Sequence, residues 1–229
     1  MDISSQVIRR TARMGALYLI IALAMGLILT ATFSLVPANV GTTNGTQAPI
    51  DVTAYLQSLT VPFVGLVALI AATPVNMLFV LDKNAGVLEY LLAVGMSQRE
   101  VFKGYLKAAL AIGGLAMAPS VLLNVAVHGA TVTTAEVVGL GVMTAVAVVS
   151  LVTVLMTSFS SMQRKPTGMN SPLGIGVGVV AIIPEMLLGA VLGAYSLLFD
   201  AIVGAAVLVV ALGMLFSIDR LISREKLLP

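Results

Sequence analysis

Residues able to do chemistry are scarce in this chain, and the most distinctive is an acid within an apolar segment. Glu185 follows Pro184 about twelve residues into the run 173–193, which is ~18 Å along a helix. A carboxylate at that depth in a membrane is costly and usually functional, so Glu185 is a candidate to line a transport pathway. The alternative is that Pro184 ends a shortened helix and leaves Glu185 in a wet outer vestibule. Asn76 and Asn124, polar residues within other apolar runs, are further pathway candidates.

Several kinds of site are excluded by composition. There are no cysteines and one histidine, His128, so disulfides, thiolate metal sites and multi-histidine zinc sites are ruled out. The phosphate-binding pattern Gly-x-x-x-x-Gly-Lys-Ser/Thr is missing, so the chain has no recognisable ATP site of its own. A net charge of +2 does not suggest nucleic acid. We therefore predict no catalytic residue, no metal and no bound cofactor.

A second group of informative residues lies in the connection 82–107, which joins two apolar runs and overlaps the start of the second. Apolar residues recur there at helical spacing and predict a short amphipathic helix over 84–95, capped by Asn84 and ended by Gly95. Its leucines form one stripe: Leu88, Leu91 and Leu92. That stripe has no evident partner within so short a loop, so the helix must lie against the membrane or another protein.

The turn after this helix contains the pattern Ser97-x-x-Glu100, which predicts a capping box. The Ser97 hydroxyl would accept from the Glu100 amide, and the Glu100 carboxylate from the Ser97 amide. The box would start the next apolar helix. Glu89 and Arg99, on either side of the turn, are charged residues that can pair with a partner protein. The alternative is that they only hold the short helix at the level of the lipid headgroups.

The elements that position these residues are apolar runs long enough to cross a bilayer. The chain is 59% hydrophobic and 10% charged, with a mean hydropathy of +1.08, so lipid must be its main solvent. A membrane helix needs ~20 apolar residues. Six runs qualify and predict an all-α protein with one transmembrane domain over 1–229: 14–36, 59–81, 104–127, 136–158, 173–193 and 198–217.

The placement of Lys and Arg predicts the direction of these spans. Basic residues precede the first run, follow the last, and lie in the second and fourth connections, but none lies in the first, third or fifth connection. Positively charged short loops stay cytoplasmic, so both termini are expected inside and loop 37–58 outside, in a multi-pass protein of the cytoplasmic membrane. Within that loop, Asn44-Gly45-Thr46 is a possible glycosylation site, or simply part of a flexible linker.

The connection 82–107 resembles the cytoplasmic signature of the permease subunits of type-2 ABC exporters. The resemblance rests on the pattern Gly86-x-Leu88-Glu89-x-Leu91-Leu92, then Gly95-x-Ser97, then Glu100 and Lys103. Six spans, inward termini and a sizeable first outer loop agree with it. Met96 stands where the family usually has proline, and the stretch between the last two runs is short for the family.

The resemblance implies that two copies of this permease, as a homodimer, pair with two separate ATPase subunits that bind ATP and Mg²⁺. Segment 84–95 would be the coupling helix in a groove of the ATPase, and ATP hydrolysis would move an unidentified substrate outward by alternating access. The interface residues that it implies are Gly86, Leu88, Glu89, Leu91, Leu92, Gly95, Ser97, Arg99 and Glu100.

Two other functions stay open on the sequence. A secondary transporter would work through intramembrane acids and usually shows duplicated halves. This chain has one candidate acid, and its sequence shows no internal repeat, which count against that function. A membrane anchor that recruits an ATPase for signalling, without transport, is the other. An intramembrane enzyme is disfavoured because His128 lies in a predicted loop and no aspartates cluster.

Overall fold

The computed structural model describes residues 3–35, 52–162 and 196–217, and all regular secondary structure in these ranges is helical. The all-α prediction is confirmed for this part of the chain. The helices are α1 (Ile3–Met14), α2 (Ala16–Leu35), α3 (Val52–Asn84), α4 (Val87–Ala93), α5 (Gln98–His128), α6 (Val132–Met162) and α8 (Ser196–Phe216).

Three helices are long and apolar enough to cross a membrane, namely Leu59–Asn84 in α3, Gln98–His128 in α5 and Val132–Ser161 in α6. A fourth is added if Ile3–Met14 and Ala16–Thr32, which meet at an angle of 81°, count as one broken span. Several such helices in one chain indicate a multi-pass membrane protein.

Six spans are not shown, because the predicted run 173–193 lies outside the described residues, together with Glu185 and Asn44. The run 198–217 overlaps α8, which ends at Phe216 and whose apolar portion Ala201–Phe216 is shorter than the three long helices. Helix α3 begins at Val52, within the stretch 37–58 that was predicted as an outer loop, and its span-forming part begins at Leu59.

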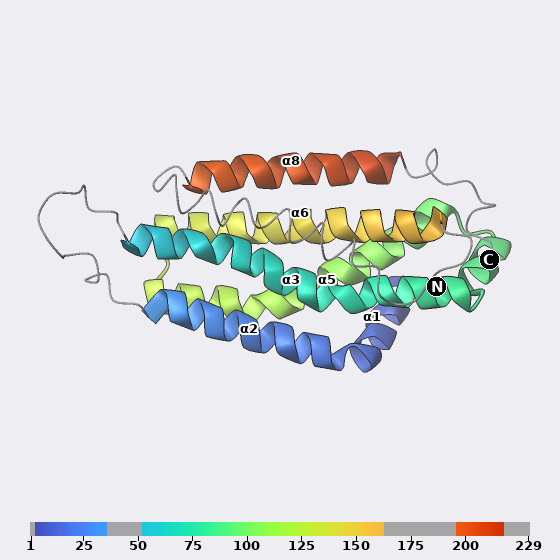
Figure 1. The fold of residues 1–229 in the computed structure, drawn as a ribbon, viewed down its shortest axis with the longest axis horizontal. Helices are drawn as coiled ribbons and strands as arrows, with labels where there is room; N and C mark the ends of the chain where they lie inside the picture. Colours follow the sequence, from blue (N-terminus) through green and yellow to red (C-terminus); the bar gives the residue numbers. More distant parts are fainter. Residues whose placement is uncertain (1–2, 36–51, 163–195, 218–229) are drawn as a thin grey trace, which may run out of the picture.

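The long helices lie side by side, and the short ones gather at one end of the bundle (Figure 1). Helix α3 is central, packing against α2, α5 and α6, while α8 packs on α6. Helix α4 lies at the turn between α3 and α5, and α1 packs across these same two helices. We call this the α4 end of the bundle.

A cluster of three aromatic rings lies in the core near the α4 end. Phe79 of α3 contacts two aromatic rings of α5, with centroids 5.4 Å from Phe102 and 5.0 Å from Tyr105. The second pair is edge-to-face, an arrangement that aromatic quadrupoles favour. All three rings are fully buried, so they fix the junction of α3 and α5.

The bend between α1 and α2 is fitted closely to α3. Gly15 lies at the bend, and a Cβ atom placed there would be 2.5 Å from the ring carbons of Pro74. That distance is below any normal carbon contact, so only glycine allows α1 and α2 to approach α3 in this way. The contact positions α1 alongside the α4 end.

Candidate functional site

Two glycines with positive φ mark the ends of α4. Gly86, at φ 71°, precedes the first residue, and Gly95, at φ 98°, follows the last turn. Both values lie in the region that glycine adopts without steric cost. The helix therefore covers Val87–Ala93, not 84–95, and the predicted cap Asn84 is instead the last residue of α3. The chain reverses at Gly86, which is why the earlier cap is not used.

The turn from α4 into α5 is held by two backbone motifs. The Met96 amide donates to the Leu91 carbonyl and the Gly95 amide to the Leu92 carbonyl, which is the Schellman pattern expected around a left-handed glycine. The predicted capping box is confirmed: the Glu100 amide donates to Ser97 Oγ at 3.2 Å, and the Ser97 amide donates to Glu100 Oε2 at 2.8 Å. The turn thus joins α4 firmly to α5.

The leucine stripe of α4 faces the protein's own core. Leu88 is 1% exposed and belongs to the main core cluster, against which Leu91 and Leu92 also pack. The sequence offered no partner for this stripe within its own short loop, and the partner is instead the core at the ends of α3 and α5. The exposed face of α4 instead presents Tyr90, 67% exposed, and Val94, 65% exposed.

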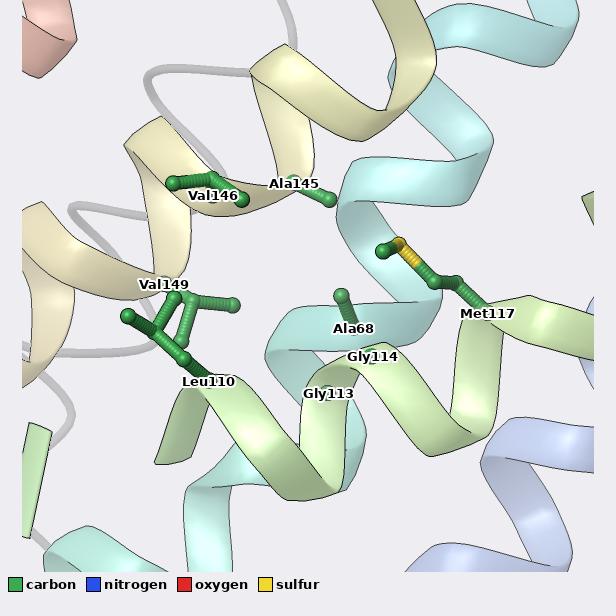
Figure 2. Close-up of a pocket in the computed structure, with 8 residues that line it drawn as sticks. All are labelled: Ala68, Leu110, Gly113, Gly114, Met117, Ala145, Val146 and Val149. Atoms are coloured by element: carbon green, nitrogen blue, oxygen red, sulfur yellow. The ribbon is translucent and has the colours of Figure 1, made fainter. Parts of the chain in front are cut away.

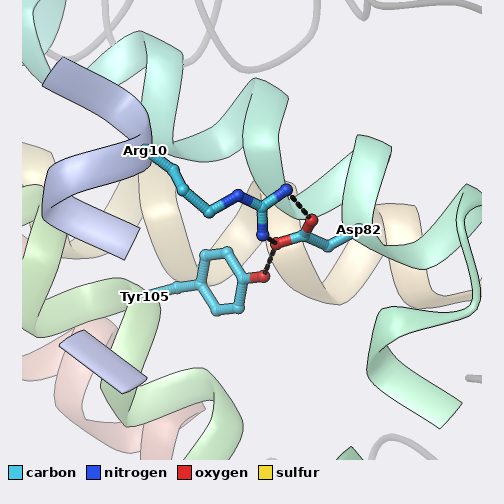
Figure 3. A network of polar contacts seen from close by, with 3 residues as sticks. All are labelled: Arg10, Asp82 and Tyr105. Carbon is cyan, nitrogen blue, oxygen red and sulfur yellow. Dashed lines mark hydrogen bonds and ion pairs between the residues drawn. The ribbon is translucent and has the colours of Figure 1, made fainter. Parts of the chain in front are cut away.

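A buried carboxylate ties α1 to the end of α3 (Figure 3). Asp82, whose side chain is 2% exposed, faces Arg10 with both oxygens, at 2.6 Å from Nη2 and 2.9 Å from Nη1. The Tyr105 hydroxyl of α5 donates to the same carboxylate at 2.5 Å. One acid therefore joins α1, α3 and α5. Arg10 is one of the basic residues before the first apolar run that predict orientation, and no pattern in the sequence links it to Asp82.

The neighbouring residue ties α3 to α6. The Lys83 ammonium is buried and donates to the carbonyls of Ser160 at 2.9 Å and Ser161 at 3.0 Å. Carbonyls in the last turn of a helix lack intrahelical partners, and a cation there also suits the helix dipole. The negative charge of Asp82 thus binds α1 to α3, and the positive charge of Lys83 binds α6 to α3.

The predicted interface charges differ in their surroundings. Arg99 lies over the ring of Phe216 in α8, with Cζ 5.1 Å from the ring centroid, which is a cation–π contact. Glu100 is engaged in the capping box, and Glu89 is half-buried on α4. Arg99 therefore contacts this chain's own α8 rather than standing free.

The two asparagines proposed for a pathway are not brought together. Val67 and Ser120 both approach Gly26, so they lie at one height in the bundle. From that height, Asn76 lies further along α3 toward the α4 end, and Asn124 lies further along α5 toward the opposite end. At ~1.5 Å per residue, the two asparagines are ~20 Å apart along the bundle axis. Asn76 Oδ1 and Asn124 Nδ2 are buried, and neither has a hydrogen-bond partner among the described residues.

A small apolar hollow lies between α3, α5 and α6 (Figure 2), with about 170 Å³ of empty space, part of it open to the outside. Its eight lining residues are Ala68, Leu110, Gly113, Gly114, Met117, Ala145, Val146 and Val149. None of these side chains can orient a ligand by hydrogen bonds. Within the described ranges, no three histidine or carboxylate residues group as metal ligands would.

Comparisons with protein-family models, curated proteins and solved structures give no match to this chain. The candidate site is therefore defined by geometry alone: the short helix α4, its glycine-bounded turns, and the polar ties at Asp82 and Lys83.

Proposed function

We propose that this chain is the membrane-spanning permease subunit of an ATP-driven exporter of the type-2 ABC class. It would act as a homodimer with two copies of a separate ATPase subunit, in the cytoplasmic membrane, with the α4 end inside the cell. The observation that carries the proposal is α4 itself, a seven-residue helix placed between two long apolar helices and joined to them by tight turns.

The packing of α4 suits the transmission of force. Leu88 anchors α4 in the core, and the capping box at Ser97 fixes the start of α5. A push on α4 is thereby passed to the ends of α3 and α5 instead of being absorbed by a loose loop. The ties at Asp82 and Lys83 extend the connection to α1 and α6. Four helices would move together when the ATPase closes, which is what alternating access of a bundle requires.

The surface offered to the ATPase differs from the one that the sequence pattern predicted. Because the leucine stripe packs inward, the partner would contact the opposite face, around Tyr90 and Val94, with Glu89 at its edge. An exposed aromatic residue beside an apolar one is typical of the anchors that dominate protein interfaces. We therefore assign the docking role to Tyr90 and Val94, and an anchoring role to Leu88, Leu91 and Leu92.

The test is recovery of an ATPase with the tagged chain from membranes of its native cell. We expect the wild-type chain to co-purify in mild detergent with a protein that carries a phosphate-binding loop. A Tyr90→Asp/Val94→Asp variant should lose at least ~90% of it, because two charges would enter a desolvated apolar contact. Val132→Asp is the matched control, since Val132 is 77% exposed at the other end of the bundle.

Three outcomes contradict the proposal: no ATPase with the wild-type chain, equal recovery with the double variant, or equal loss with Val132→Asp. The first would favour a secondary transporter. Recovery of an ATPase that drives no vesicle transport would favour the membrane anchor instead.

A further inference from the structure

Helix α1 packs against the sides of the long helices and not across their ends. Its contacts are with the sides of α3 and α5: Ile3 packs where Gly104 has no side chain, and Gly15 meets Pro74. Gly104 lies more than a turn inside the start of α5, and Pro74 more than two turns before the end of α3. The outward face of α1 therefore points sideways, toward whatever surrounds the bundle at this height.

Two arginines occupy that outward face. Val7 and Thr11 are buried against the bundle, whereas Arg9 and Arg13 are exposed on the opposite side. Residues four apart are neighbours on a helix surface, so the two guanidinium groups lie next to each other. Like charges in this spacing repel one another, which an anion between them would relieve.

No residue of the described part of the chain neutralises this pair. The ion pair of α1 is made by Arg10, and no acid pairs with Arg9 or Arg13 in the described ranges. Within the described residues, the three arginines of α1 thus divide into one that forms an ion pair and two that do not.

The surrounding apolar residues show the height at which this pair lies. Exposed apolar side chains begin at the last residue of α1, Met14, and continue after the bend with Leu17, Ile20 and Ile21. This change from exposed arginine to exposed apolar residues is expected where headgroups give way to hydrocarbon. We therefore expect the arginine pair at headgroup level, in reach of lipid phosphates.

We propose that Arg9 and Arg13 bind the phosphate of an anionic phospholipid of the adjacent leaflet. Guanidinium groups form paired hydrogen bonds with phosphate oxygens, and two neighbouring ones can hold a single headgroup from both sides. The site would fix the height of α1 in the membrane. The proposal needs only that the chain spans a membrane, and it stands or falls separately from the ATPase partner.

The test is native mass spectrometry of the purified full chain, titrated in detergent with phosphatidylglycerol or phosphatidylcholine. We expect one phosphatidylglycerol to bind more tightly than the rest, and phosphatidylcholine not to replace it. Arg9→Gln/Arg13→Gln should weaken that binding about thirtyfold, since each basic residue near an anionic lipid contributes roughly fivefold. The matched control is Lys103→Gln/Lys107→Gln, which removes the same charge from exposed positions on α5.

Equal weakening in the control would show a general charge effect and overturn the site, as would unchanged binding in the arginine variant. Inorganic phosphate at millimolar concentration should not displace the lipid. If it does, the ligand is a soluble anion and the proposal is wrong. Circular dichroism of both variants should match the wild type, because all four side chains are exposed.

Discussion

Arg10 of α1 and Asp82 of α3, 72 residues apart in the chain, form a bidentate ion pair at the α4 end of the bundle. The Asp82 side chain is buried and the Arg10 side chain is 47% exposed, so the pair lies at the boundary of the core. Because Tyr105 shares the carboxylate, the pair joins three helices at the level from which α4 projects.

Removal of Arg10 should leave a buried carboxylate without its cation. We expect Arg10→Gln to lower the free energy of unfolding by about 1–3 kcal/mol, below the full cost of breaking a deeply buried pair, because water reaches this arginine. Asp82→Asn in the same background should restore part of the loss. SDS unfolding of the purified chain in mixed micelles measures both, and equal stability of Arg10→Gln and wild type would contradict the role of the pair.

The close contact of Gly15 with Pro74 predicts a sharp steric effect. Gly15→Ala should destabilise the chain by about 1–3 kcal/mol, because the proline ring cannot rotate away from the added methyl group. Gly139→Ala is the control, since a Cβ at Gly139 meets nothing within 4 Å. Thermal unfolding followed by circular dichroism compares the two. The same loss at both positions would mean that close packing at the bend is not the cause.

Lys83 is expected to stabilise the end of α6. Lys83→Met should lower the free energy of unfolding by about 1–3 kcal/mol, because two buried carbonyls lose a charged donor. Lys107→Met makes the same substitution at an exposed position, where changes usually stay within ~0.5 kcal/mol. Hydrogen exchange should also rise locally at the end of α6. A neutral Lys83→Met would show that the lysine is dispensable there.

The local parts of this site could be predicted from sequence, and the long-range parts could not. The capping box involves residues three apart, and Gly95 acts on its own turn, so the pattern contains all the information needed. The leucine stripe shows which face of α4 is apolar but not what covers it. The pairing of Asp82 with Arg10 depends on the bend at Gly15, which no local pattern indicates. Polar residues on separate helices therefore could not be matched, and nothing in the sequence shows that the pathway candidates Asn76 and Asn124 lie at different heights in the bundle.

The orientation of the bundle can be tested with single cysteines, because the chain has none of its own. Val132→Cys, at the end opposite α4, should react with an impermeant thiol reagent in intact cells. Tyr90→Cys should react only after the membrane is opened, since the α4 end is proposed to face the cytoplasm. Both side chains are exposed within the chain. The opened membranes are first stripped of bound ATPase, so that labelling at Tyr90 depends on the membrane and not on the proposed partner. The reverse labelling pattern would overturn the predicted direction.

The most direct measurement of the central claim is photo-cross-linking from α4 in living cells. A photoreactive phenylalanine analogue at Tyr90 should yield one covalent adduct with an ATPase that carries a phosphate-binding loop, identified by mass spectrometry. The same analogue at Val132 should give no such adduct. An adduct with the ATPase at Tyr90 and none at Val132 is the result predicted for a coupling helix. Cross-links from Tyr90 only to lipid, or to the ATPase from both positions alike, would contradict it.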